Sequence, residues 1–119
     1  MSKTHIIMYH YVREIKNSKF KNIKGLELDS FKNQLNYFSE NFNIIDPKIL
    51  NPDNKKKLED KSCVLTFDDG YKDHIKFVYP ELKKRNLKGL FFPPGEAIIE
   101  RKMLGANKIH YIFASTKDK

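Results

Sequence analysis

The sequence contains a single cysteine, and no apolar stretch approaches the ~18 residues of a membrane-spanning helix. A lone cysteine excludes an intrachain disulfide and is typical of a reducing compartment. The N-terminus, MSKTHIIMYHYVREIK, lacks the sustained apolar core of a secretory signal. These absences predict a cytoplasmic protein without a membrane span. Internal repeats and low-complexity segments are also absent, so a single domain over residues 1–119 is expected.

Basic residues outnumber acidic ones, 23 to 15, which gives a net charge of +8. Such a surplus favours anionic partners such as nucleic acid or an anionic glycan. The lysines are scattered, however, and only NKKK (Asn54–Lys57) forms a run. Zinc-finger spacing, a Gly-rich phosphate loop and aromatic–basic strings are all missing. The sequence therefore gives no strong nucleic-acid signal, and a basic surface that keeps the protein soluble is the simpler interpretation.

The N-terminal half alternates between strand-like and helix-like segments. HIIMYHYV (His5–Val12) is rich in β-branched and aromatic residues and predicts a strand. NIIDPKIL (Asn43–Leu50) predicts a short strand that ends before Pro47. Between them, apolar residues recur at helical spacing behind Asp29, which is a natural N-cap. The residues of that pattern, which we expect to face the core, are Phe31, Leu35, Phe38 and Phe42.

A strand, a helix and a second strand are predicted next along the chain. SCVLTF (Ser62–Phe67) is a continuous apolar run typical of a strand covered on both faces, so Cys63 is expected to be a buried, inert thiol. A helical pattern follows, in which Pro80 implies a kink or a fresh start, and LKGLFF (Leu87–Phe92) is the second strand. Strands joined in this way are parallel, with a right-handed crossover, which predicts an α/β fold. Glu96–Ser115 predicts one or two further helices.

Two neighbouring acids, Asp68 and Asp69, follow the first of these strands. Chemistry in parallel α/β sheets collects at the carboxyl ends of strands, and adjacent residues leaving a strand point in different directions. Asp69 can then hold a divalent ion while Asp68 takes a proton from water on that ion. The alternative is an Asp-Asp-Gly turn whose side chains cap the next helix. A phosphatase of the haloacid dehalogenase type is set aside, because Gly70 stands where its Asp-x-Asp pattern needs an acid.

The string VLTFDDGYKDHIKFVYPELKKRNLKGLFF resembles the first motif and following β–α–β unit of polysaccharide deacetylases, carbohydrate esterase family 4. MYHYV and FKNQLNYFSENFNII are similar to the N-terminal portion of many members, so the resemblance runs from about Ile6 to Pro94. It implies a partial or deformed (β/α) barrel with parallel strands, and metal-dependent removal of an acetyl group from an N-acetylated sugar. By motif match, Asp68 corresponds to the general base and Asp69 to a metal ligand, with zinc as the expected ion.

Other residues near the acids have expected roles of their own. His10 ends the first strand and is predicted to reach the same rim and bind the metal ion. Tyr71 is predicted to contact substrate, with packing under the turn as the alternative. Gly70 permits the tight exit from the strand. His74, in the first turn of the next helix, is expected to be exposed or capping, and His110 to be a satisfied, partly buried residue.

The family pattern is incomplete in this sequence. Members complete their metal site with two histidines one helical turn apart, and no histidine here has another four residues away. The later Arg-x-Pro and Leu-x-Leu-His segments are also missing. A closed barrel takes roughly 200 residues or more, so we expect an N-terminal fragment, a truncated product, or a minimal relative whose open sheet edge is covered by homo-oligomerisation. Three functions remain open: a deacetylase of an N-acetylated saccharide, a non-catalytic relative with a binding or scaffolding role, and a basic binder of nucleic acid or anionic glycan.

Overall fold

A parallel sheet with β5 at its centre organises the computed structural model, which describes residues 3–54 and 57–116. β1 runs beside β5 along one edge, whereas β4 and then β6 pair with successive parts of β5 on the other edge. All of these pairings are parallel. The strands are β1 (Thr4–Tyr9), β4 (Asn43–Ile44), β5 (Ser62–Asp68) and β6 (Gly89–Phe92).

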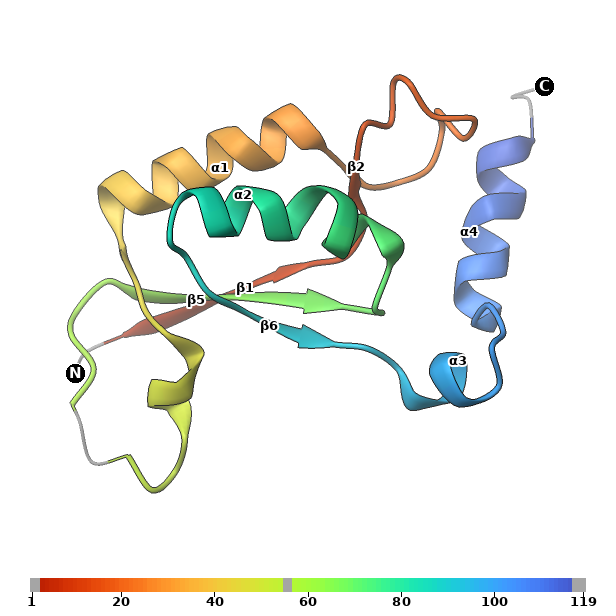
Figure 1. Ribbon diagram of the computed structural model, residues 1–119. Coiled ribbons are helices and arrows are strands. Elements are labelled where there is room, and N and C mark those ends of the chain that lie inside the picture. The colour runs from red at the N-terminus through yellow and green to blue at the C-terminus, as the bar shows by residue number, and fades with distance from the viewer. Residues whose placement is uncertain (1–2, 55–56, 117–119) are drawn as a thin grey trace.

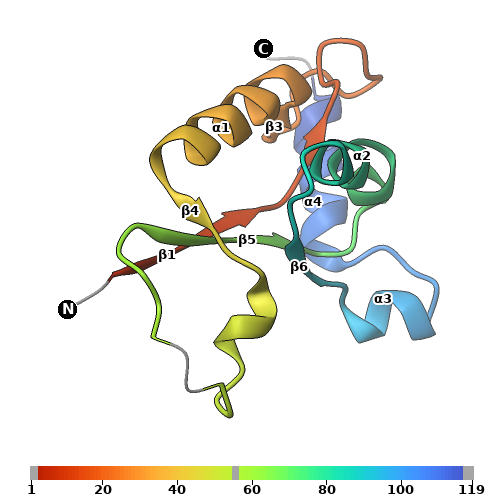
Figure 2. The same ribbon diagram turned by 60° about the vertical axis from the view of Figure 1, so that its left-hand side comes forward.

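Helices α1 (Leu28–Asn41) and α2 (Tyr79–Lys84) cover one face of this sheet, as Figures 1 and 2 show from two directions. The buried residues between the helices and the sheet form the main core. Because strand side chains alternate between faces, the other face carries a separate set. On it, Ile6, Met8 and Phe92 are each more than half exposed. The core residues are Tyr9, Val12, Phe31, Leu35, Leu65, Phe67, Val78 and Leu82.

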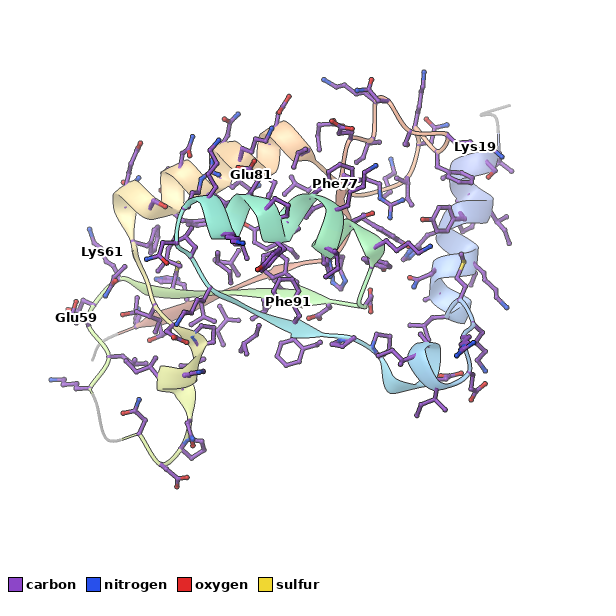
Figure 3. All side chains as sticks on the ribbon, viewed as in Figure 1. Lys19, Glu59, Lys61, Phe77, Glu81 and Phe91 are labelled. Carbon is purple, nitrogen blue, oxygen red and sulfur yellow. The ribbon has the colours of Figure 1, made fainter. Side chains whose placement is uncertain are left out.

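Phe67 is the aromatic centre of that core. Its fully buried ring stacks on Tyr9 with 5.2 Å between centroids and on Phe91 with 4.8 Å, while Phe31 meets it edge-on. Phe91 of β6 lies on the α2 side of the strand, where side chains fill the space below the helix (Figure 3). Gly89 makes this stack possible, because a Cβ there would lie 2.7 Å from Cε2 of Phe67.

The helical segment after β5 begins as a π-helix, η2 (His74–Val78), and continues as α2. Pro80 occupies the first turn of α2, where its missing N–H costs nothing. In a continuous α-helix the proline ring would collide with the carbonyl of Lys76, four residues earlier. The sequence predicts a kink or a fresh start at Pro80, and the structure shows a change from π-helix to α-helix there, without a break in the helical backbone at Val78 and Tyr79.

Smaller elements surround the carboxyl ends of the strands. The segment after β1 forms β2 (Val12–Arg13), which pairs with β3 (Leu26–Glu27) in a separate two-stranded sheet. Helices α3 (Gly95–Ile99) and α4 (Gly105–Ser115) lie beyond the ends of β5 and β6 (Figure 1). Ala114 of α4 packs in a second cluster with Tyr11 and Ile23. The short 3-10 helix η1 (Pro47–Leu50) follows β4.

The prediction of an α/β fold with parallel strands is confirmed. The strands within residues 3–54 and 57–116 form an open sheet, so the expected barrel is not closed by the described part of the chain. Cys63 is buried, as expected. The predicted N-cap at Asp29 is wrong, because α1 begins at Leu28 and Glu27 occupies the N-cap position, without a side-chain capping hydrogen bond. Asp29 instead lies in the first turn, where an acid still interacts favourably with the helix dipole.

Among the helices of the described residues, none combines the length and the apolar character that crossing a membrane requires.

The contact between Gly89 and Phe67 leads to a stability prediction. Gly89→Ala forces the Phe67 ring out of its stack, and we expect a loss of about 1–3 kcal/mol of unfolding free energy, as for other overpacked cores. Gly95→Ala is the matched control, because a Cβ at Gly95 meets nothing within 4 Å. Chemical denaturation of both variants measures the difference. Equal stability of the two variants would contradict the close packing of β6 on Phe67.

Candidate functional site

Asp68 and Asp69 leave the sheet at the carboxyl end of β5. Asp68 is the last residue of the β5–β6 ladder, opposite Phe92, and the Asp69 N–H still donates to the Phe92 carbonyl at 3.2 Å. Asp69 and Gly70 then adopt left-handed backbone conformations, with φ of 72° and 59°. A Cβ on Gly70 would also lie 2.8 Å from Cβ of Pro93. The predicted tight exit at Gly70 is confirmed, and the same turn gives the two carboxylates different surroundings.

Hydrogen-bond donors converge on one oxygen of Asp69. The Tyr71 hydroxyl donates to Oδ2 at 2.7 Å, and Nδ1 of His10 lies 3.1 Å from the same oxygen. Partial burial acts to raise the pKa of the Asp69 carboxyl, but the hydrogen bonds from Tyr71 and His10 outweigh it, so the pKa lies below its ordinary value. The structure thus brings His10, Asp69 and Tyr71 together, as the sequence predicts. Their roles toward metal and substrate stay predictions.

Asp68 has different surroundings from its neighbour. Its side chain is partly exposed and makes no hydrogen bond or ion pair with the residues that the structure describes. A carboxylate without fixed partners at a strand end is available to accept a proton from a ligand or from water. The two acids are therefore inequivalent: Asp69 is held by neighbours, and the Asp68 side chain has no partner among the described residues.

Tyr71 links the acid to helix α4. Its ring stacks on Tyr11 with 4.1 Å between centroids, and its hydroxyl lies 2.9 Å from the side-chain amide of Asn107. The Tyr11 hydroxyl lies 3.2 Å from the same amide. The Tyr71 hydroxyl has one hydrogen and can donate to one partner only. When the Asn107 amide turns its NH₂ group toward the tyrosines, that group donates to the hydroxyl oxygens, and the Tyr71 hydrogen is left for Asp69. Burial, and then the bond to Asp69, raise the pKa of Tyr71 above its ordinary value, so it stays a donor.

His74 differs from the prediction of an exposed or capping residue. It is 2% exposed, its ring contacts Phe67 and Tyr71, and its Nε2 lies 3.0 Å from the backbone oxygen of His10. A neutral imidazole that donates from Nε2 leaves Nδ1 without a hydrogen-bond partner among the described residues. The wider π-helical turn carries this position toward the core. His110 is exposed and not partly buried as predicted, but it has a hydrogen-bond partner as expected, since its Nδ1 lies 3.3 Å from the Tyr11 hydroxyl.

A nearly buried ion pair between Arg13 and Asp73 connects the elements next to the rim. Nε of Arg13 donates to Asp73 at 2.6 Å, and Nη1 donates to the Tyr111 hydroxyl at 2.9 Å. Burial alone would lower the pKa of Arg13, but the bonds to Tyr111 and Asp73 raise it on balance. The pair joins β2 to the turn that follows Asp69 and to α4. Sequence patterns give no signal for it, because Arg13 and Asp73 lie 60 residues apart.

The metal ion that the resemblance implies needs more ligands than this rim supplies. An imidazole nitrogen and a carboxylate oxygen, the donor types of His10 and Asp69, suit zinc. Catalytic zinc sites take three protein ligands. Within residues 3–54 and 57–116, no cluster of three or more His, Cys, Asp or Glu side chains is arranged to hold a metal ion. The described residues therefore fit part of a metal site and do not complete one.

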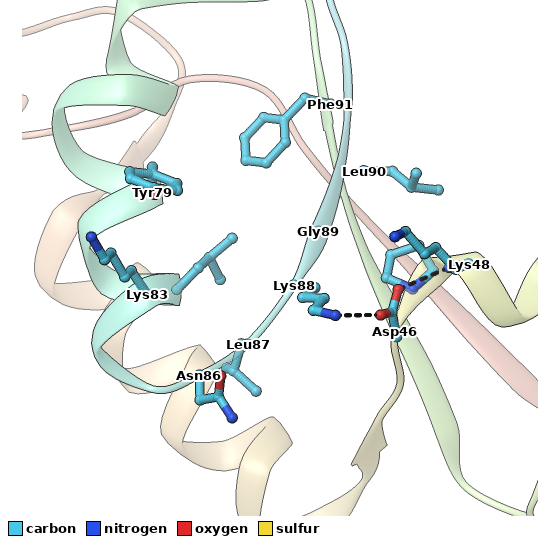
Figure 4. A pocket seen from close by; sticks show the side chains of 12 residues that line it. Asp46, Lys48, Tyr79, Lys83, Asn86, Leu87, Lys88, Gly89, Leu90 and Phe91 are labelled. Carbon is cyan, nitrogen blue, oxygen red and sulfur yellow. Dashed lines mark hydrogen bonds and ion pairs between the residues drawn. The ribbon is translucent and has the colours of Figure 1, made fainter.

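A mainly apolar groove lies away from the acids. It has a volume of about 490 Å³ and opens between α2 and the amino-terminal part of β6 (Figure 4). Its carboxylate, Asp46, is committed to an ion pair with Lys88 at 2.5 Å and to the backbone N–H of Lys48. Asp68 lies at the opposite end of the β6 pairing, beside Phe92. This groove therefore offers no free acid or base, and we place the candidate reaction at the rim.

Comparison with known proteins gives one consistent family. Residues 55–111 match the family model described as polysaccharide deacetylase. The YxkH protein of Bacillus subtilis (strain 168), whose name assigns it to the polysaccharide deacetylases, is 44% identical over 43 residues. A solved de-N-acetylase from Aggregatibacter actinomycetemcomitans is similar with a TM-score of 0.63 and 27% identity over 76% of this chain. The Streptococcus pyogenes deacetylase PplD, solved with acetate, gives 0.52 and 29% over 75%.

The chain is much shorter than these relatives. It spans 37% of the solved de-N-acetylase chain and 41% of the PplD chain. The match to YxkH covers 36% of this chain and 15% of that protein. The similarity therefore applies to one part of the relatives' structure, the part that contains the Asp68–Asp69 rim.

The hydrogen bond from Tyr71 gives a prediction about acid titration. Tyr71→Phe removes a donor from Asp69, so we expect the Asp69 pKa to rise toward the ordinary value of about 3.9. The Asp69 pKa is lower in the folded chain than in the unfolded chain. Asp69 therefore stabilises the fold at pH values above its unfolded pKa, and this stabilisation is lost as the pH falls through the folded pKa. The variant should therefore lose part of that contribution, and acid should unfold it at a higher pH.

Carboxyl NMR titration of the metal-free protein measures this shift. Tyr37→Phe is the matched control, because Tyr37 is 55% exposed on α1 and should leave the Asp69 pKa unchanged. An Asp69 pKa in Tyr71→Phe equal to that of the parent chain would show that the hydroxyl does not stabilise the carboxylate.

Proposed function

We propose that this chain, whose residues 55–111 match the polysaccharide deacetylase family model, acts in the metal-dependent hydrolysis of an acetyl group from an N-acetylated sugar or polysaccharide. The proposal is supported by the family match over residues 55–111 and by two solved deacetylases of similar fold. The single observation that carries it is the inequivalence of two adjacent acids at a strand end: Asp68 without a partner among the described residues, Asp69 held by His10 and Tyr71.

Asp68 is the general base of this proposal. Hydrolysis of the amide requires that water lose a proton as its oxygen bonds to the acetyl carbon. Asp68, whose carboxylate is partly exposed and unpaired in the described structure, accepts that proton. The nitrogen of the sugar receives a proton as the C–N bond breaks, and the products are acetate and a free amine. In this step the sheet has one role, which is to orient Asp68 at the rim.

Asp69 and His10 are the proposed metal ligands. Their donor atoms lie 3.1 Å apart and come from the ends of adjacent strands, β5 and β1. Tyr71 donates to the same oxygen of Asp69 that His10 contacts, and zinc is the proposed ion. Residues 3–54 and 57–116 hold no cluster of three or more His, Cys, Asp or Glu side chains, so a complete metal site would need further ligands beside these two.

A non-catalytic relative is the second candidate function. It is favoured by the same incomplete donor set, since a chain that cannot retain an ion keeps the rim only for binding or scaffolding. A basic protein that binds nucleic acid or anionic glycan has the charge of +8 in its favour and no structural feature beyond it.

Metal binding and acetate release separate these candidates. In Asp68→Asn, we expect acetate release from an N-acetylglucosamine oligomer to fall by about 10²–10⁴, the usual contribution of a general base. Affinity for Co²⁺, followed by its absorption spectrum, should stay unchanged in this variant. Asp69→Asn and His10→Ala should weaken Co²⁺ binding, because each removes a proposed ligand.

Asp53→Asn serves as control, since Asp53 lies on an exposed loop away from the rim. Unchanged acetate release in Asp68→Asn would contradict the general-base role. A parent chain that takes up no ion at micromolar Zn²⁺ and releases no acetate would favour the non-catalytic relative.

A further inference from the structure

A second cavity, of about 420 Å³, opens next to the acid rim. One wall is the turn that follows Asp69, and the other is formed by α3, α4 and the loop between them. Its volume is within the range of small-molecule sites, about 300–1,000 Å³. We call it the rim cleft. The lining residues used below are Tyr71, Lys72, Ala97, Leu104, Asn107 and Tyr111.

The rim cleft shares a wall with the candidate site. Tyr71 lines the cleft, and its hydroxyl donates to Asp69 at 2.7 Å. Asn107 lines the cleft as well and contacts the same hydroxyl. A ligand in the cleft would therefore be separated from Asp69 by the Tyr71 side chain.

The charges around the cleft largely cancel. Arg13 is paired with Asp73 at 2.6 Å, and Lys102 is paired with both Glu96 and Glu100, at 2.8 and 2.6 Å. Lys72 also lines the cleft, and its ammonium group makes no ion pair with the described residues. A cleft with this balance suits a neutral polar ligand better than a polyanion.

The remaining lining groups suit a sugar ring. Ala97, Met103 and Leu104 provide an apolar surface, and the rings of Tyr71 and Tyr111 add aromatic area. Lys72 supplies hydrogen-bond donors to hydroxyl groups, and Asn107, whose NH₂ group faces the tyrosines, has its side-chain oxygen left as an acceptor. An apolar surface with a few convergent polar groups is the usual composition of a ligand site, and a pyranose has the matching apolar faces and polar edges.

We propose that the rim cleft is a saccharide subsite that binds the unit next to the one presented to Asp68. This inference rests on the proposed function, because that function supplies the saccharide class. Tyr71 divides the subsite from the acids, so binding in the cleft and reaction at the rim can be altered separately.

A binding experiment in the absence of turnover tests this subsite. The Asp68→Asn chain, free of metal, is titrated with an N-acetylglucosamine tetramer and followed by backbone amide NMR. We expect shifts at Lys72, Ala97, Leu104 and Asn107. Ala97→Trp, placed in the same background, should fill the cleft and weaken binding about tenfold or more, a loss of roughly 1.4 kcal/mol.

The control is Ala106→Trp, which makes the same substitution at an exposed position of α4 that does not line the cleft. Thermal unfolding verifies that both tryptophan variants fold. Lys72→Ala gives a second variant, with an expected weakening that requires no change in cleft volume. Unchanged affinity in Ala97→Trp, shifts confined to other surfaces, or no binding at millimolar tetramer would each overturn the subsite.

Failure of the subsite can be distinguished from failure of the proposed function. If the parent chain binds the tetramer in the cleft and releases no acetate under any metal, the proposed function fails while the subsite stands. If the parent chain releases acetate and Ala97→Trp leaves both the affinity and the KM for the tetramer unchanged, the subsite fails alone.

Discussion

The backbone pairing of β5 on both edges is the constraint on which the site depends. β1 bonds along nearly its whole length, and β4 and β6 share the opposite edge, so the strand has little freedom to shift. Its residues from Ser62 to Thr66 are buried, and Phe67 is enclosed by aromatic rings. A change of register by one residue would turn every one of these side chains to the wrong face. The position of Asp68 and Asp69 at the rim follows from this packing.

The difference between the two acids arises from the backbone after the strand. Asp68 still has extended pairing with Phe92, whereas Asp69 has a left-handed conformation that turns its carboxylate toward β1 and Tyr71. Such conformations are costly for residues other than glycine and are concentrated at functional sites. The hydrogen bonds that Asp69 gains offset part of this cost. Two identical side chains in sequence thus acquire different neighbours through one turn.

The sequence predicts the parallel core and the meeting of His10 with Asp69, because both follow from local pattern. An apolar run specifies β5, and parallel pairing of Tyr9 with Phe67 places the next residues of both strands at the same edge. The buried His74 could not be predicted, because π-helical geometry changes which face a position occupies. Asn107 and the Arg13–Asp73 pair depend on the placement of α4 and β2, far apart in sequence from their partners, and no periodicity encodes that placement.

Tyr71 shows how the proposed site and the proposed subsite constrain each other. The single hydroxyl hydrogen of Tyr71 is committed to Asp69 at 2.7 Å, and the raised pKa of that hydroxyl keeps it there. Tyr71 therefore cannot donate to a sugar without releasing Asp69, which would let the carboxylate's pKa rise. A saccharide in the rim cleft would contact the ring of Tyr71, accept hydrogen bonds from Lys72 and donate to the side-chain oxygen of Asn107. On this argument Tyr71 positions the acid through its hydroxyl and borders the substrate through its ring.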